Sequence, residues 1–201
     1  MKTSGELSVV RAKPSDRAVL ARVLRRAFGN EPAQTWLFPN RYVRAVASHL
    51  WFVAALNAGF DRGRVWCLAD RTAVGVWFPP GATAELQGPA ERWLRVLVSM
   101  AGGAERRRIT LERALHEHRP IEQHWHLAAV GTEIHAQGQG RGRAVLEPGL
   151  DVCDSEKVLA YLETSEARSV SFYARLGFSV RSEIRAGTAP HVWCMVRTPR
   201  P

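Results

Sequence analysis

The chain has 201 residues, of which 46 % are apolar and 23 % are charged, and this composition is ordinary for a globular protein that buries its core without disulfides. Its three cysteines, Cys67, Cys153 and Cys194, are odd in number and far apart, which argues against a disulfide framework and favours a reducing compartment. The start of the chain lacks the apolar core of a signal peptide. The longest apolar stretch, around residues 51–56, is too short to span a bilayer, so we expect a cytoplasmic protein with no membrane partner.

The formal net charge is +9, and arginine carries nearly all of the positive charge, because Lys2, Lys13 and Lys157 are the only lysines. Such an excess could steer an anionic cosubstrate or an RNA toward the protein. A solvated surface whose arginines have no particular partner, in a genome that favours arginine codons, is the preferred interpretation. The charge alone therefore fixes no ligand, and a tRNA stays open as a partner.

The first quarter of the chain predicts a strand and two helices. Residues 7–12 have the pattern of a short strand, and the Pro-Ser-Asp run at 14–16 is typical of a helix start. Apolar residues then recur at helical spacing as far as Phe28. We expect a loop with two prolines to follow, and a second helix over about residues 41–57.

The middle of the chain predicts a hairpin and a helical insertion. Two aromatic, β-branched runs at 64–69 and 73–78 are separated by three polar residues, which indicates an antiparallel hairpin. From about residue 89 to 117 the pattern predicts two helices broken at Gly102-Gly103, within an insertion over about residues 83–118. We interpret the run Arg106-Arg107-Arg108 as a solvated face rather than a binding patch.

The second half alternates strands and helices. Strands are expected at 124–132, 158–164, 178–184 and 191–197, with helices up to about 154 and over 167–176. This order predicts one mixed α/β domain, residues 1–201, around a single sheet.

A glycine-rich segment between a strand and a helix carries the clearest chemical signal. Its sequence is Gln137-Gly138-Gln139-Gly140-Arg141-Gly142. Glycines at alternate positions let the backbone approach a ligand closely, and the free amides of the following helix point at an anion such as a pyrophosphate. A Walker A loop is excluded because no lysine follows, and the spacing G-x-G-x-G differs from that of a Rossmann turn.

Two motifs together resemble the GNAT superfamily of N-acyltransferases. Gln-x-x-Gly-x-Gly after a strand is similar to that superfamily's coenzyme A pyrophosphate loop. Ser169-Val170-Ser171-Phe172-Tyr173-Ala174-Arg175-Leu176-Gly177-Phe178 is similar to its N-x-x-F-Y-x-x-x-G-F signature. Further segments, among them Leu162-Glu163-Thr164-Ser165 and Trp193-Cys194-Met195, are similar to the puromycin N-acetyltransferase branch. The resemblance implies an α/β (α+β) GNAT fold, with a mostly antiparallel mixed sheet, splayed central strands and flanking helices.

The resemblance also implies roles for individual residues. Acetyl-CoA, or another acyl-CoA, would be the cosubstrate, with Val130 and Thr132 contacting its pantetheine arm and the glycine segment holding its pyrophosphate. An amide near Val130 would polarise the thioester carbonyl. Tyr173 would protonate the departing thiolate. The motif's asparagine is Ser169 here, and serine makes fewer hydrogen bonds, so the contacts beside the thiol are expected to differ.

The acceptor side is less determined by the sequence. Glu163, His124 and His126 are candidate bases, and the two histidines are expected to share a face of one strand. No third ligand lies near the His-x-His pair, so we expect no metal. The expected acceptor is a small-molecule amine.

Three aromatic residues, Trp36, Phe38 and Trp193, are expected to stack on a flat acceptor. The protein is expected to be a monomer or a homodimer.

Three functions follow as hypotheses. The first is an N-acetyltransferase that modifies an antibiotic or a biosynthetic intermediate. The second is a tRNA-dependent enzyme of the same fold, which would use aminoacyl-tRNA as donor or as acceptor; the charge and Ser169 favour it. The third is a non-catalytic ligand sensor, against which Tyr173 and the intact glycine segment argue.

Overall fold

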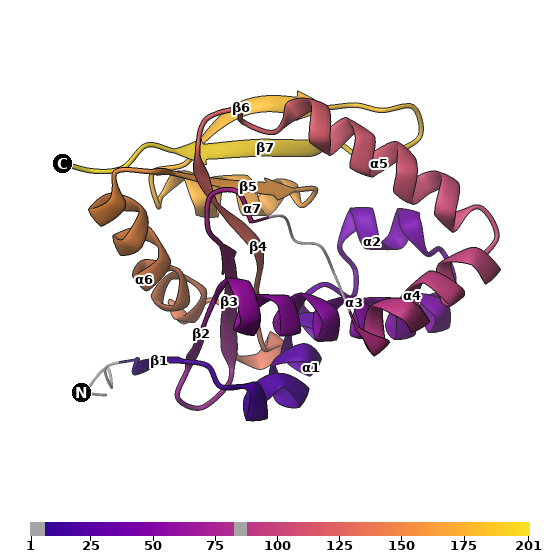
Figure 1. Ribbon diagram of the computed structural model, residues 1–201, viewed down its shortest axis with the longest axis horizontal. Helices are drawn as coiled ribbons and strands as arrows, with labels where there is room; N and C mark the ends of the chain where they lie inside the picture. The colour runs from indigo at the N-terminus through magenta and orange to yellow at the C-terminus, as the bar shows by residue number, and fades with distance from the viewer. Residues whose placement is uncertain (1–6, 83–87) are drawn as a thin grey trace.

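The computed structural model describes residues 7–82 and 88–201, and in this part of the chain seven strands form one sheet in the order β1-β2-β3-β4-β5-β7-β6 (Figure 1). Every neighbouring pair is antiparallel except the central pair β4–β5, which is parallel. The mixed, mostly antiparallel sheet predicted from the sequence is therefore confirmed. The strands are β1 Val9–Arg11, β2 Arg64–Leu68, β3 Ala73–Phe78, β4 His124–Thr132, β5 Leu159–Thr164, β6 Ser179–Ile184 and β7 Val192–Arg197.

Helices cover both faces of this sheet, as Figure 1 shows, with α6 on one side and α1, α3 and α5 on the other. The side chains of α1 and α3 pack on β2 and β3, those of α6 and α7 pack on the opposite face, and α2 and α5 pack on β5 to β7. The helices are η1 Pro14–Asp16, α1 Arg17–Ala27, α2 Pro32–Leu37, α3 Arg41–Arg62, α4 Pro89–Met100, α5 Ala104–His118, η2 Ile134–Ala136, α6 Arg141–Glu156 and α7 Ala167–Ala174.

The prediction of a loop after the first helix is wrong for residues 32–37, because these residues form the short helix α2. Pro32 occupies its first turn, where a proline costs no hydrogen bond, and the Glu31 side chain accepts the N–H of Gln34 as a cap. The second long helix, α3, ends at Arg62 rather than near residue 57. Its last turns stay buried because Gly59 lets the helix approach β2 and β3 closely.

A bulge at Ala128 shapes the centre of the sheet. Val76 pairs with Ala129 but Trp77 pairs with Leu127, so β4 carries one extra residue opposite β3. The bulge changes which face of the sheet the odd-numbered residues of β4 point to. Before it, Trp125 and Leu127 face α6; after it, a side chain at position 131 would face α1. A bulge bends its strand.

The two central strands separate at this point. The parallel pairing of β4 with β5 ends at His126 and Tyr161, two residues before Ala128. Beyond it, β4 has no partner strand on this edge among residues 7–82 and 88–201. The splayed central strands that the resemblance implied are therefore present.

The expected helical insertion corresponds to α4 and α5, which meet at Gly103 in a left-handed conformation. Its first residues, 83–87, lie outside the described part of the chain, as do residues 1–6 of the polar start. The assignment of the whole chain to one domain stays a prediction. All three cysteines are buried and free, and no helix of the described residues is long and apolar enough to cross a membrane.

Candidate active site

A cavity of about 850 Å³ lies where β4 and β5 diverge. It is lined by β4, the glycine segment, the start of α6, the end of β5, α7, α5 and the segment between α1 and α2. Most residues expected from the sequence to form the site meet here, although they come from distant parts of the chain. These are Val130, Thr132, Gln137, Gly138, Gly140, Arg141, Gly142, Glu163, Ser169 and Tyr173.

The glycine segment forms an open turn at the start of α6. Gly138 and Gly140 have φ values of 75° and 77°, and no atom lies within 4 Å of where a Cβ would stand. Gly140 caps the helix without a side chain, so the amides of residues 141–143 have no partner within the helix. These amides and the helix dipole favour a bound anion at this end of the cavity.

The polar side chains of the segment hold the turn in place. The Arg141 guanidinium donates to Asp70 Oδ2 at 2.5 Å and to Thr72 Oγ1 at 2.6 Å, which ties the turn to the β2–β3 connection. The Gln137 amide donates to the carbonyl of Thr132 at 3.2 Å. Gln139 does not line the cavity; its amide donates to a backbone carbonyl, that of His135, at 3.3 Å. Backbone groups are therefore the main anion donors of this segment.

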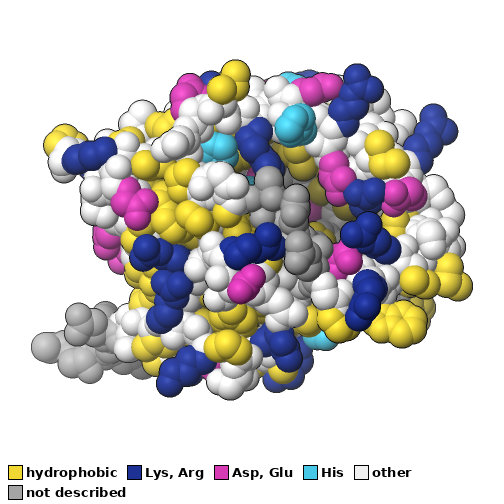
Figure 2. Space-filling view, viewed as in Figure 1, with side chains coloured by type: hydrophobic (Ala, Val, Ile, Leu, Met, Phe, Trp, Pro, Cys, Tyr) yellow, Lys and Arg dark blue, Asp and Glu magenta, His cyan; other side chains and the backbone are white. Residues whose placement is uncertain are grey.

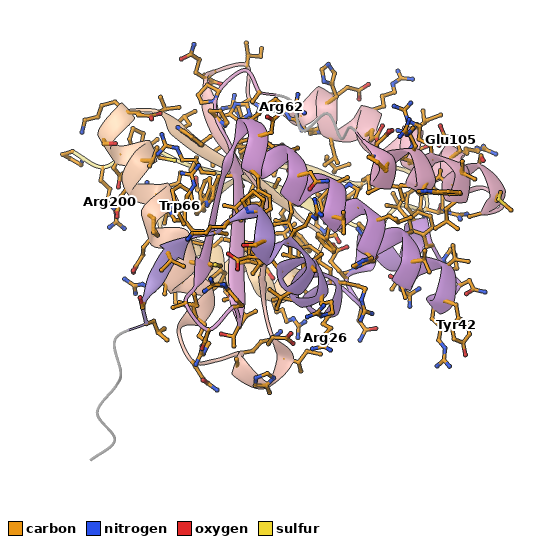
Figure 3. The ribbon with its side chains drawn as sticks, turned by 60° about the horizontal axis from the view of Figure 1, so that its bottom comes forward. Arg26, Tyr42, Arg62, Trp66, Glu105 and Arg200 are labelled. Carbon is orange, nitrogen blue, oxygen red and sulfur yellow. The ribbon has the colours of Figure 1, made fainter. Side chains whose placement is uncertain are left out.

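Three further arginines, Arg143, Arg168 and Arg175, line the same end of the cavity. The guanidinium of Arg143 is paired with Glu147 at 2.9 Å on the helix surface. At the opposite wall Arg26, from the end of α1, pairs with Glu133 at 3.0 Å, and Figure 3 shows where it lies. The excess of arginine at this end adds to the attraction that the helix start exerts on an anion.

Tyr173 lies on α7, one turn after Ser169, and both line the cavity. Its ring packs against Phe172 and Phe178, with centroids 5.1 and 5.8 Å away. Burial raises the pKa of the Tyr173 phenol above its ordinary value, so the group stays protonated at neutral pH.

Glu163 and His126 form a close pair across the last paired residues of β4 and β5. His126 Nε2 lies 2.7 Å from Glu163 Oε2, and an Arg119 nitrogen lies 3.6 Å from Oε1. Burial alone would raise the pKa of Glu163, but His126, Arg119 and Tyr161 outweigh it and lower the pKa to about 2. Glu163 is therefore a carboxylate at neutral pH, and one of its oxygens accepts the N–H of His126 Nε2.

His124 and His126 share a face of β4, as expected, and both contact the ring of Tyr161. His124 Nδ1 lies 2.7 Å from the carbonyl of Glu122, and burial lowers the pKa of this imidazole. Neither histidine lines the cavity, whereas Glu163 does. Among residues 7–82 and 88–201, no three His, Cys, Asp or Glu side chains form a group that could hold a metal ion.

Glu31 is a cavity residue that the sequence analysis missed. Its two carboxylate oxygens accept from the Ser165 hydroxyl and from the N–H of Gln34, and the Ser165 oxygen accepts the N–H of Ala33 at 3.0 Å. These contacts join the start of α2 to the end of β5. Burial raises the pKa of Glu31. A glutamate before a proline, at a possible helix start, was the one local signal for it.

The three aromatic residues expected to bind the acceptor are not brought together. Phe38 is buried among Ala47, Val98 and Ala104, outside the cavity. Trp193 stacks on His191, with ring centroids 4.0 Å apart, and also lies outside it. Trp36 lines a second cavity beside α5.

Comparisons with known proteins give matches in sequence and in architecture. The model of the acetyltransferase (GNAT) family matches residues 90–178. An uncharacterized N-acetyltransferase of Schizosaccharomyces pombe is 26 % identical over 151 residues, which are 66 % of this chain and 58 % of that protein. The chain thus spans little more than half the length of this relative.

Two solved structures are similar over nearly their whole length. The first is described as histone acetyltransferase HPA2 and related acetyltransferase from Corynebacterium glutamicum; it has a TM-score of 0.73 at 22 % identity and covers 97 % of both chains. The second is arylalkylamine N-acetyltransferase 2 of Aedes aegypti, with a TM-score of 0.64 at 9 % identity, covering 98 % of this chain and 100 % of that one. The chain has the GNAT fold, and the acetyltransferase (GNAT) family model matches part of it, residues 90–178.

Proposed function

We propose that the protein transfers an acetyl or another acyl group from an acyl-CoA to a primary amine of a small molecule, by direct attack in a ternary complex. One observation carries this proposal: a single cavity joins an anion-binding turn, an unpaired strand edge, the Tyr173 phenol and the Glu163 carboxylate. The turn and Tyr173 lie toward the α6–α7 side, and Glu163 lies toward the α5 side, so donor and acceptor can approach from opposite faces of the sheet.

The residues on the α6 side fit an acyl-CoA donor. The amides at the start of α6 hold the pyrophosphate, and Gly138 and Gly140 leave it room. The open edge of β4 beyond His126 binds the pantetheine arm as an added strand. An amide near Val130 polarises the thioester carbonyl, where negative charge builds up during attack.

Tyr173 acts on the leaving group. As the carbon–sulfur bond breaks, negative charge collects on the sulfur, and the phenol donates its O–H to it. The packing around the ring holds the group in one position, which is the condition for this kind of catalysis.

Glu163 and His126 act on the acceptor amine. A carboxylate with a pKa of about 2 is a weak base by itself, but it attracts the ammonium form of the amine into the cavity. We assign proton removal to Glu163, the member of the pair that lines the cavity: it accepts the proton as the carbon–nitrogen bond forms and the nitrogen becomes acidic, while His126 holds the carboxylate through the Nε2 hydrogen bond.

The walls near Glu163 favour a small amine with an apolar part. Ala33, Leu111 and Leu115 line this end of the cavity together with the carboxylates of Glu31 and Glu163. The name of the mosquito relative refers to an arylalkylamine, and the sequence resembles the puromycin N-acetyltransferase branch. Both are consistent with an antibiotic or a biosynthetic intermediate as acceptor.

The test is a screen of primary amines with acetyl-CoA, in which released thiol is measured. Acetyl-CoA should also raise the melting temperature through ligand linkage. Thiol release that depends on the amine, and that disappears in Glu163→Gln, supports the proposal. Acetyl-CoA that neither binds nor stabilises the protein would contradict it.

A tRNA-dependent reaction stays a prediction that no contact of the described residues favours. Figure 2 shows arginines spread over one face among acidic side chains rather than gathered in one patch. Several are paired with glutamates, such as Arg108 with Glu105 and Glu112. Saturable tRNA binding at physiological salt, with activity lost after ribonuclease treatment, would favour the alternative. The cytoplasmic location and the state as a monomer or homodimer also stay predictions.

A further inference from the structure

A second cavity, of about 750 Å³, lies beside the acceptor end of the first. It is bounded by α2, α5 and the connection between β6 and β7, and α2 lies next to α5 in Figure 1. On α2, Trp36 lines this cavity and Ala33, one turn earlier, lines the first. On α5, Arg107 lines the second cavity and Leu111, one turn later, lines the first. The two cavities therefore follow the same pair of helices.

The three consecutive arginines of α5 differ in their contacts. Arg108 is paired with Glu105 and Glu112 and does not line the cavity. Arg106 lines it, and among the described residues its guanidinium has no hydrogen bond and no ion pair. Arg106 is exposed, as expected for a solvated face, but its side chain also borders this cavity.

Arg107 is held in position at the same wall. Its Nε and Nη2 atoms donate to the carbonyl of Leu37 at 3.1 and 2.9 Å, and Nη2 also donates to that of Gly102 at 3.2 Å. These bonds fix a cationic group beside Arg106 without neutralising its charge. Trp36 supplies an aromatic wall, and its indole N–H lies 3.4 Å from the hydroxyl of Thr188.

We propose that this second cavity binds the far end of the acceptor and selects an aromatic group that carries an anion. This inference rests on the proposed function, because it assumes that the amine of the acceptor lies near Glu163. Two arginines without a carboxylate partner attract an anion, and an indole face suits a flat ring. The acceptor class is thus a primary alkyl amine that carries an aromatic ring, with the amine and the anionic group at opposite ends.

The length of the acceptor follows from helix geometry. Leu111 lies four positions after Arg107, and Leu115 lies nine positions after Arg106. At the rise of an α-helix these separations are about 6 and 13 Å. A 4-(ω-aminoalkyl)benzoate with a chain of a few methylene groups covers this span, and the corresponding benzamide has nearly the same shape without the charge.

The experiment compares these two series on the CoA-loaded protein by calorimetry, and with acetyl-CoA by thiol release. We expect the benzoates to bind about five-fold more tightly than the benzamides, the scale of one partly exposed ion pair. Arg106→Gln should remove this preference. Arg113→Gln removes a charge from the same helix, but outside the cavity, and should leave the preference unchanged.

The outcomes separate the two proposals. Equal binding of benzoate and benzamide to the unmodified protein, or a preference that survives Arg106→Gln, would overturn the subsite. If the amines are acetylated without any benzoate preference, the proposed function stands and the subsite falls. If the benzoates are preferred but no thiol is released with any amine, the subsite stands and the proposed function falls. Trp36→Leu should weaken both series equally, since it removes the aromatic wall and no charge.

Discussion

Gly140 offers a sharp test of the anion site, because a side chain there would enter open space at the start of α6. In Gly140→Asp the new carboxylate can accept the free amides of the helix start, as an N-cap aspartate does, and so occupy the donors that a pyrophosphate needs. It also adds a negative charge beside the phosphates. Both effects lower the affinity for CoA without touching the core.

The loss in affinity for CoA follows from the repulsion between the new carboxylate and the phosphates. A carboxylate about 5 Å from one phosphate charge costs about 3 kcal/mol at an effective dielectric of 20, which is more than a hundred-fold in affinity. The left-handed backbone adds a strain of about 1–2 kcal/mol to folding, not to binding. Gly81 has a φ of 76° and equally open surroundings, so Gly81→Asp carries the same strain away from the cavity and is the matched control.

The assay is calorimetry with CoA and, separately, with pantetheine, which lacks the pyrophosphate. Gly140→Asp should lose about a hundred-fold or more in affinity for CoA and little for pantetheine. Gly140→Asn tests the two effects separately, because it can cap the amides but adds no charge. Wild-type CoA affinity in Gly140→Asp, or an equal loss in Gly81→Asp, would refute the assignment of the glycine segment as the pyrophosphate site.

Three further predictions concern catalysis and stability. Tyr173→Phe keeps the ring and removes the O–H, so single-turnover acyl transfer should fall about 100-fold to 10,000-fold with a modest change in the donor KM; an unchanged rate would make Tyr173 a packing residue only. Because the pKa of Glu163 in the folded protein lies below its unfolded value, its contribution to stability is present above about pH 4.5 and is lost as the pH falls toward 2. Between pH 5 and pH 3, the free energy of unfolding measured in urea should fall by about 2 kcal/mol more in the wild type than in Glu163→Gln. An equal fall in the two proteins would contradict the close pair with His126. Gly149→Ala should destabilise the protein by about 1–3 kcal/mol despite a better helix propensity, because its Cβ would stand 2.4 Å from the buried ring of Trp77; a variant as stable as wild type in urea would contradict this packing.

One exposed surface is left without a role. Trp93, Val96 and Met100 lie exposed on one face of α4, and Tyr42 is exposed at the start of α3, where Figure 3 shows it projecting outward. Such a group of apolar side chains is larger than the scattered ones that any surface carries. Substituting Trp93 and Met100 with lysine should leave CoA binding unchanged, because neither lines either cavity.

The sequence by itself determined the order of the elements, and it predicted the chemistry of the donor side. Strand alternation, helical spacing and glycine breaks are local properties, so the hairpin, the helix break at Gly103 and the strand His124–Thr132 were predictable. The glycine segment was recognisable because an anion-binding turn is built from neighbouring residues. Local signals fail at Pro32, because a proline is found both in loops and in the first turn of a helix. Here it lies in the first turn of α2.

Only the tertiary structure decided the acceptor side. The bulge at Ala128 depends on pairing with β3, and the parallel pairing of β4 with β5 ends two residues before it. The pairs His126–Glu163 and Glu31–Ser165 join residues 37 and 134 positions apart, and no periodicity in the sequence encodes such contacts. The same holds for the second cavity, which exists because α2 and α5 pack side by side although some 70 residues separate them.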